Sequence, residues 1–309
     1  MAITTTVSGT SSFNLDLNNL VEEAFERCGA QLRTGYDLRT ARRSLNLLTI
    51  EWANKGINLW TVEPGQIQLN QGQIMYALPI DTIDLLDHVV RTGTGQNQTD
   101  INITRISEST YITIPNKNAQ GRPIQVWINR QSGAENATSI TTAEALDATE
   151  TTVTLSTTVG LAQFGFIKVG SETIQYGGIS GNDLVDCIRG VNNTTATTHL
   201  TGAAVSVQNL PTVNVWPAPE QDSYYTMVYY RLRRIQDGGD GGMHTQDIPF
   251  RFLPAMVAGL AFHLSLKIPE AQSRVADLKA MYDEAFQLAA DEDREKASLR
   301  LAPRMQFVR

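Results

Sequence analysis

His88 and its two acidic neighbours come nearest in this sequence to residues whose types and spacing could do catalysis. Asp84 and Asp87 precede His88, and a histidine beside a carboxylate can act as a general base for an activated nucleophile. The sequence marks no such nucleophile near this group. We therefore interpret His88 as a surface histidine on a strand edge or a turn, and we predict that the protein is not an enzyme.

Two glycine-containing segments lack the features of a nucleotide site. Residues 93–95 (GTG) have neither the third glycine nor the strand-to-helix setting of a dinucleotide site. Residues 238–242 (GGDGG) lack the lysine and the serine or threonine of a phosphate loop. The second segment is typical of a flexible link. We predict no bound cofactor.

The two cysteines do not form a disulfide framework or a zinc site. Neither Cys28 nor Cys187 has a second cysteine or a histidine at ligand spacing. Cys28 falls on the apolar stripe of a predicted helix, where a cysteine is usually a small buried hydrophobe. We predict no metal site.

Charge and hydropathy restrict the partners. The chain has 309 residues and a formal net charge of −7 at pH 7, and this balance does not suggest a surface that grips nucleic acid. No apolar run approaches the roughly 20 residues that cross a bilayer, and residues 1–12 lack the charged start and apolar middle of a signal peptide. We expect a soluble, unsecreted protein with no membrane partner.

Strong helical periodicity is confined to the two ends of the chain. Apolar residues at steps of three and four run from Leu17 to Cys28, with Asn14 or Asp16 as a possible cap, and again from Leu38 to Trp52. Residues 247–290 predict two further helices that meet near Pro269. None of these helices can bury its stripe alone, so we expect the two ends to pack together as a helical bundle.

Three arginines lie together on the polar side of the second predicted helix. Arg39, Arg42 and Arg43 follow Asp37, the expected cap of that helix. One interpretation is a solvated helix face. The other is a contact with acidic groups, either phosphate or a neighbouring subunit.

A β region begins after the second helix. Residues 67–69 and 74–78 flank the turn residues Asn70-Gln71-Gly72 and predict a hairpin. Residues 212–216 form another strand candidate. Residues 224–233 alternate with aromatic side chains on both faces, so we expect a strand buried on both faces that is central or covered by a partner chain.

The middle of the chain has the character of an insertion. Residues 133–145 are small and polar and predict a linker. Short strand candidates with glycine-bearing turns follow up to residue 207, enough for a small all-β module in a loop of the parent β region.

The predicted fold class is α+β. A helical bundle of N- and C-terminal helices adjoins a central antiparallel β domain, which carries the inserted small all-β module. The expected segments are 1–57 (N-terminal helices), 58–132 (first part of the β domain), 133–207 (inserted module), 208–237 (second part of the β domain), 247–295 (C-terminal helices) and 296–309 (C-terminal tail).

The C-terminal tail mixes basic and large apolar residues with little helical period. It is either a tail that becomes ordered on a partner or a disordered terminus. The candidate contact residues are Arg300, Leu301, Arg304, Met305, Phe307 and Arg309.

Within the insertion, residues 165–172 (GFIKVGSE), 187–190 (CIRG), and His199 with Gly202 resemble a small β module that recurs in bacteriophage tail, baseplate and fibre proteins. The resemblance covers residues 147–207 and implies a module on the virion surface without a set activity. The sequence departs from the commoner pattern at residues 192–193 (NN), where a glycine is usual.

The rest of the chain resembles the head-to-tail adaptors of tailed bacteriophages, also called connector or tail tubular proteins. The resemblance rests on the order and spacing of terminal helices, residues 60–64 (WTVEP), 76–81 (YALPID), 216–219 (WPAP) and 229–231 (YYR), and it covers about residues 13–130 and 208–295.

That resemblance implies a structural virion protein. The expected partners are further copies of the chain in a ring of about twelve, the portal protein, the tail nozzle or tail tube protein, and DNA that passes through the channel without sequence-specific binding. The C-terminal tail, beginning at residue 296, would reach the portal. The expected location is the virion neck, with assembly in the host cytoplasm.

Two other classes stay open. The inserted module could belong to a tail fibre, a decorating protein or a receptor-binding protein, but the chain has neither the repeats nor the heptads of a fibre. A cell-wall hydrolase would need a paired-carboxylate or Cys/His site, and the sequence marks none.

Overall fold

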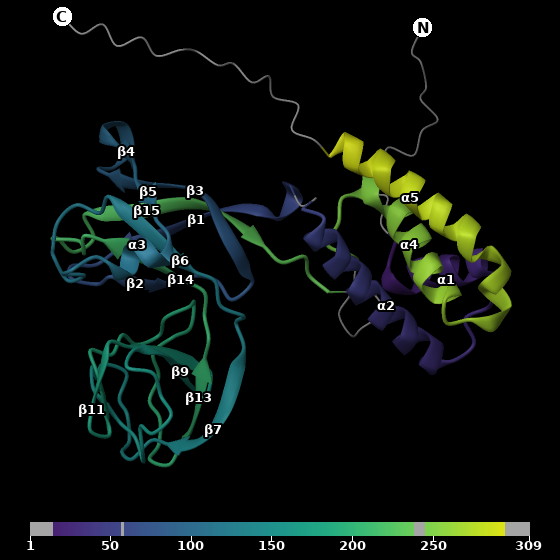
Figure 1. Cartoon of the computed structure of the whole chain (residues 1–309). Helices are drawn as coiled ribbons and strands as arrows, with labels where there is room; N and C mark the ends of the chain where they lie inside the picture. The colour runs from purple at the N-terminus through teal and green to yellow at the C-terminus, as the bar shows by residue number, and fades with distance from the viewer. Residues whose placement is uncertain (1–14, 57–58, 238–244, 294–309) are drawn as a thin grey trace, which may run out of the picture. The chain divides into compact units, whose positions relative to one another are not determined.

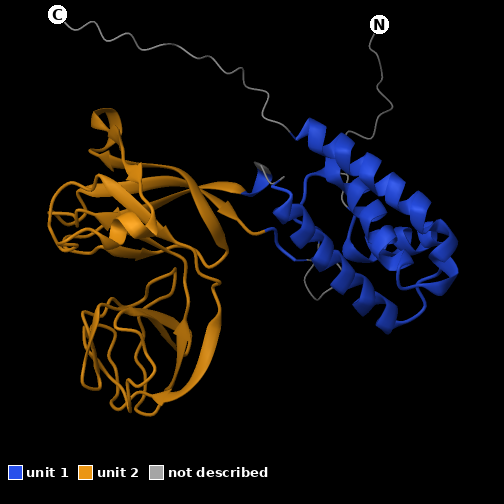
Figure 2. Cartoon of the chain, in the orientation of Figure 1, with its two compact units in different colours: residues 1–61, 235–309 blue, residues 62–234 orange. Residues whose placement is uncertain are grey.

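The computed structural model describes residues 15–56, 59–237 and 245–293, which form a mixed α+β structure (Figure 1). Contacts divide the chain into two compact units, residues 1–61 with 235–309 and residues 62–234 (Figure 2). The helices of the described residues are α1 (Leu17–Cys28), α2 (Gly35–Asn54), η1 (Leu59–Thr61), α3 (Glu108–Ile112), η2 (Gly95–Asn97), η3 (Phe250–Phe252), α4 (Leu253–Ser265), η4 (Pro269–Arg274) and α5 (Val275–Glu292).

The strands fall into four sheets, and all but one of the pairings within them are antiparallel. The first sheet has the order β1 (Val62–Leu69), β15 (Tyr225–Arg233), β3 (Thr82–Thr92), β4 (Thr99–Asn102), and the second the order β2 (Met75–Ala77), β14 (Thr212–Trp216), β6 (Gln125–Asn129), β5 (Thr104–Arg105). The third has the order β10 (Glu172–Tyr176), β9 (Gly165–Val169), β13 (Ala204–Gln208), β7 (Glu135–Thr141), and the fourth the order β11 (Gly178–Ser180), β12 (Asp183–Val185), β8 (Val153–Thr154).

The first unit is organised around α4. This helix is apolar almost all round, and a helix of that kind must lie inside a core. Nine of its thirteen residues are buried. It packs against α1, α2 and α5. Trp52 of α2 stacks in a tilted arrangement on Phe252 and donates a 2.9 Å hydrogen bond from its ring nitrogen to the hydroxyl of Tyr282. The two ends of the chain therefore share one hydrophobic core.

The starts and ends of these helices follow local chemistry. Asp16 caps α1 by accepting from the backbone N–H of Asn19 at 2.8 Å, and Gly29 ends it in the left-handed region at φ 75°. Thr34, rather than Asp37, is the N-cap of α2, and Asp37 completes a capping box with it. Pro269 begins η4 rather than the long C-terminal helix, and α5 starts six residues later at Val275.

The helical unit also takes residues that the sequence analysis assigned to the β domain. Trp60 of η1 stacks on Phe252 with ring centroids 5.0 Å apart, and its ring nitrogen donates to the carbonyl of Asp247. Ile235 packs against the same core. Apolar burial against α4 therefore decides where this unit ends.

The predicted hairpin of residues 67–69 and 74–78 is wrong. β1 pairs over its whole length with β15, and β2 pairs with β14 in the second sheet. The turn after Leu69 instead carries the chain from one sheet to the other, and the hydroxyl of Tyr76 accepts a hydrogen bond from the backbone of Asn70. Both sheets contribute to one hydrophobic core.

β15 is central, as predicted, because it pairs with β1 on one edge and β3 on the other. Its expected burial on both faces is wrong. Tyr225, Met227 and Tyr229 are buried, whereas Tyr224, just before the strand, and Tyr230 are each half exposed. Only one face of the sheet meets the core, which is usual for an antiparallel sheet.

Residues 133–145 are not a linker without structure. β7 occupies much of this segment and pairs with β13 along the edge of the third sheet. Most of its side chains are exposed, and Ile140 is its one buried residue. Backbone bonds to β13 therefore hold most of its length in the sheet. The strands of residues 135–208, with Ile140 of β7 among them, enclose a separate hydrophobic core.

Candidate functional site

His88 is not held as a general base. It lies half-buried on the inner strand β3, and neither ring nitrogen has a hydrogen-bond partner among the described residues. Asp84 forms an ion pair with Arg105 at 2.9 Å instead. Burial lowers the pKa of His88, and the positive charge of Arg105 lowers it further, against the opposing effect of Asp87 and Asp84. The sequence neighbours therefore do not form a carboxylate–histidine pair.

The two cysteines are buried and free, and the burial of Cys28 was predicted. Burial raises the pKa of each thiol to about 11, and the Cys28 thiol donates to the carbonyl oxygen of Ala261. Both stay protonated at neutral pH, which does not suit a nucleophile or a metal ligand. Within the described residues, no group of three or more His, Cys, Asp or Glu side chains is placed to hold a metal ion.

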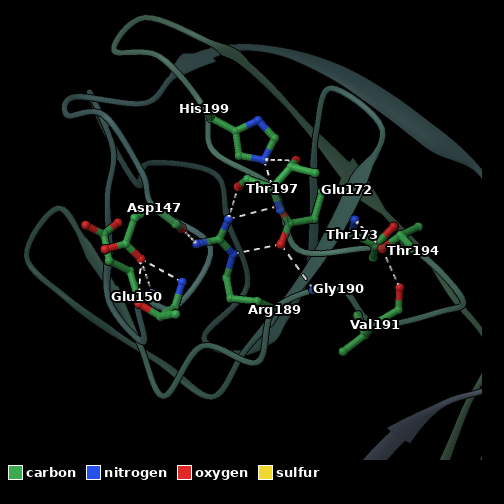
Figure 3. A network of polar contacts seen from close by, with 11 residues as sticks. Asp147, Glu150, Glu172, Thr173, Arg189, Gly190, Val191, Thr194, Thr197 and His199 are labelled. Atoms are coloured by element: carbon green, nitrogen blue, oxygen red, sulfur yellow. Dashed lines mark hydrogen bonds and ion pairs between the residues drawn. The ribbon is translucent and has the colours of Figure 1, made fainter.

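A buried network of polar side chains lies in the inserted module (Figure 3). Glu172, at the start of β10, has a side chain that is 0% exposed. Its carboxylate accepts two hydrogen bonds from the guanidinium of Arg189, at 2.7 and 2.8 Å. It also accepts from the backbone N–H groups of Gly190 and Thr197, and the Nε2 atom of His199 lies 2.7 Å from it. These residues come from three separate segments of the module.

The network keeps a carboxylate charged in the interior. Burial by itself raises the pKa of Glu172, but the hydrogen bonds from Arg189, Thr197 and His199 outweigh it and lower the pKa to about 2. Arg189 further donates to the backbone carbonyls of Asp147 and Thr197. Because the charges are closed in and satisfied, the cluster ties loops together and leaves no open position for a substrate.

This network contains four of the residues on which the module resemblance rests. Arg189 and His199 are the partners of Glu172, and Gly190 adopts φ 63°. A Cβ atom at Gly190 would lie 2.7 Å from the backbone nitrogen of Ala196, so the position accepts only glycine. At residues 192–193, where the commoner pattern has a glycine, both asparagines adopt positive φ, a conformation that asparagine tolerates better than most residues.

The three arginines on α2 do not share one environment. Arg39 and Arg43 are exposed, whereas Arg42 is half-buried on the flank of the helix. Neither Arg39 nor Arg43 forms an ion pair with a described residue. This difference follows from the 100° step between successive residues of a helix.

Arg43 lines a groove of about 500 Å³ on the helical unit, which we call the α2 groove. Lys267, just beyond α4, supplies a second cation and donates to the hydroxyl of Ser44 at 2.8 Å. Asp37 also lines the groove, but its carboxylate accepts from the backbone N–H of Thr34 in the capping box. The other lining residues are Phe25, Tyr36, Thr40, Leu47, Leu264 and Ile268.

Sequence reasoning found Arg43 but missed the groove. The sequence did contain one signal: Leu47 and Ile50 are apolar residues outside the predicted apolar face of α2. In the structure they are 58% and 57% exposed. Lys267 gave none, since only the packing of α4 against α2 brings it near Arg43. The candidate contacts Arg300, Leu301, Arg304, Met305, Phe307 and Arg309 lie outside the described residues, as does the glycine segment 238–242.

Comparison with known proteins identifies no family. No family model matches the chain, and none of the curated proteins matches it. Among the described residues, no helix is both long enough and apolar enough to cross a bilayer.

Proposed function

We propose that this chain is a structural virion protein, a head-to-tail adaptor of a tailed bacteriophage. In this proposal about twelve copies form a ring between the portal and the tail nozzle or tail tube. The ring closes the neck and conducts DNA, and the chain carries out no catalytic step.

The observation that carries the proposal is the way the two ends of the chain combine. α1 and α2 from the start and α4 and α5 from the end share one core, and the intervening residues 62–234 form a β unit of their own. The adaptor resemblance implies this arrangement. We further propose that the four longer helices act as a bundle and that residues 133–207 are a module exposed on the virion.

The charge supports a role as a conduit. A channel that passes DNA must not hold it, and a net charge of −7 repels phosphate. The exposed cations of α2 are few and stand beside apolar side chains, which suits a protein partner better than a long phosphate backbone.

The mass of the purified chain in solution, measured by light scattering alone and with the portal protein, tests the proposal. We expect a complex of about twelve copies on the portal. A stable trimer that ignores the portal would refute the adaptor and favour a fibre, decorating or receptor-binding protein.

A further inference from the structure

The helical unit has an exposed stripe on α5 that is complementary to the α2 groove in charge and in the spacing of its apolar residues. α5 presents Asp277, Met281, Glu284 and Leu288 along one line, which we call the α5 stripe; these four residues are all exposed, Leu288 to 66%. Their spacing of four, three and four residues keeps them on one face of a helix. Neither Asp277 nor Glu284 forms an ion pair with a described residue.

The charges of the two surfaces are opposite. The α2 groove offers Arg43 and Lys267 against one carboxylate, that of Asp37. Arg39 is exposed on the same face of α2. α5 carries five carboxylates against one lysine, and two of these carboxylates stand in the α5 stripe. A cationic groove and an anionic helix of this kind attract and orient each other.

The apolar parts also correspond. Met281 and Leu288 are seven residues apart, so about 10 Å separates them along the helix. On α2, Tyr36 and Leu47 lie at the groove about 16 Å apart along the axis. Two turns of an incoming helix therefore fit along the groove, with apolar anchors at the spacing used when an amphipathic helix docks into a groove.

The two surfaces belong to different sides of the same unit. α4 packs against both α2 and α5, as can be followed in Figure 1. α2 also meets α5 near its C-terminal end, through Trp52 and Tyr282, whereas the groove is lined by residues nearer the start of α2. A copy can therefore use its groove and its stripe at once, with two different neighbours. Such a contact is head to tail and propagates into a ring or a filament.

We infer that the α5 stripe of one copy docks into the α2 groove of the next. This inference rests on the proposed function only for the closure of the ring; the contact itself requires no portal. It assigns Arg39 and Arg43 to a neighbouring subunit rather than to phosphate.

Two variants of the full chain, each damaged on one surface only, test the contact. The groove variant carries Arg43→Glu and Leu47→Gln, and the stripe variant carries Glu284→Gln and Leu288→Gln. All four positions are exposed and all replacements are good helix formers, so the thermal melts should match that of the wild type. Sedimentation velocity is measured for each variant, for their equimolar mixture and for the wild type, over a wide range of protein concentration.

We expect the wild type to associate beyond a dimer as concentration rises, and each variant alone to stay monomeric. The mixture should stop at a dimer, because one intact stripe and one intact groove remain to pair. Asp283→Arg, on the opposite exposed flank of α5, is the matched control and should associate like the wild type. Variants that associate like the wild type, a mixture that stays monomeric, or a wild type that is monomeric throughout would overturn the inference.

Failure of the proposed function can be distinguished from failure of this contact. If the mixture stops at a dimer but the wild type does not bind the portal, the contact stands and the adaptor proposal falls. If the groove and stripe variants both still assemble on the portal, the adaptor stands and this contact is wrong.

Discussion

Replacing Glu172 by glutamine tests whether the buried network holds the inserted module together. Glutamine keeps the shape of the side chain and removes its charge. The guanidinium of Arg189, whose side chain is 6% exposed, would then be buried without a countercharge. Because the partners of Glu172 lie in two later segments of the module, we expect the loss of stability to extend across the module and not to be confined to one turn.

The pKa of Glu172 sets the magnitude. It falls from the ordinary value of 4.5 to about 2 in the folded protein, and a shift of this size corresponds to about 3 kcal/mol of stability at neutral pH. Since the folded pKa lies below the unfolded one, this contribution is complete above pH 4.5 and is lost as the pH falls toward 2. Removing one partner of a buried ion pair costs about 3–5 kcal/mol of stability, in agreement with the value obtained from the pKa shift.

Hydrogen exchange followed by mass spectrometry resolves the effect by segment. A loss of about 3 kcal/mol at neutral pH should speed exchange by roughly a hundredfold in peptides that cover β9 and β10. Peptides from α4, which belongs to the other unit, should exchange as in the wild type. In the wild type the protection factors of β9 and β10 should decline below pH 4.5, and in the variant this decline should be smaller, because only the titration of Glu172 is removed.

The matched control is Glu135→Gln in the same module. Glu135 pairs with Lys168 at 2.7 Å, but both side chains are partly exposed, and surface pairs of this kind contribute little. Exchange in β9 and β10 that is unchanged by Glu172→Gln, or accelerated equally by both variants, would refute the reasoning that the buried network stabilises the module.

Three further predictions follow from single contacts. Gly190→Ala should destabilise the module by about 1–3 kcal/mol, because the residue has positive φ and its Cβ would meet the backbone of Ala196; the same exchange experiment measures it, and wild-type protection would contradict it. Tyr282→Phe should cost the helical unit about 1–3 kcal/mol in denaturant unfolding, because the buried ring nitrogen of Trp52 loses its acceptor; an unchanged midpoint would show that the nitrogen finds another partner. Deleting residues 298–309 should leave the melting temperature unchanged and weaken binding to the portal, whereas portal binding at wild-type strength would remove the tail from the proposed contact.

Local pattern determined the four longer helices of this protein in advance, but not the short helix α3. Apolar residues recur at steps of three and four from Leu17 to Cys28, and α1 begins and ends at these two residues. The pattern is sufficient because one face of the helix must be buried whatever it packs against. Gly29 ends it for a reason contained in the residue itself. The sequence also predicted the central position of β15, because a strand with many large apolar side chains is usually flanked by other strands.

Only the tertiary structure decided which segments meet. The turn after Leu69 predicts a hairpin, yet β1 pairs with β15 far along the chain, because a strand pattern specifies a face and not a partner. The partly polar segment 133–145 contains β7 because backbone pairing with β13 holds it and needs few apolar side chains, Ile140 being its one buried residue. Lys267 joins Arg43 in the α2 groove, and Glu172 meets Arg189 and His199, through packing that no short window of sequence contains. The physical reason is that periodicity is a property of one segment, whereas a site is made by contacts between segments whose pairing depends on the free energy of the whole fold.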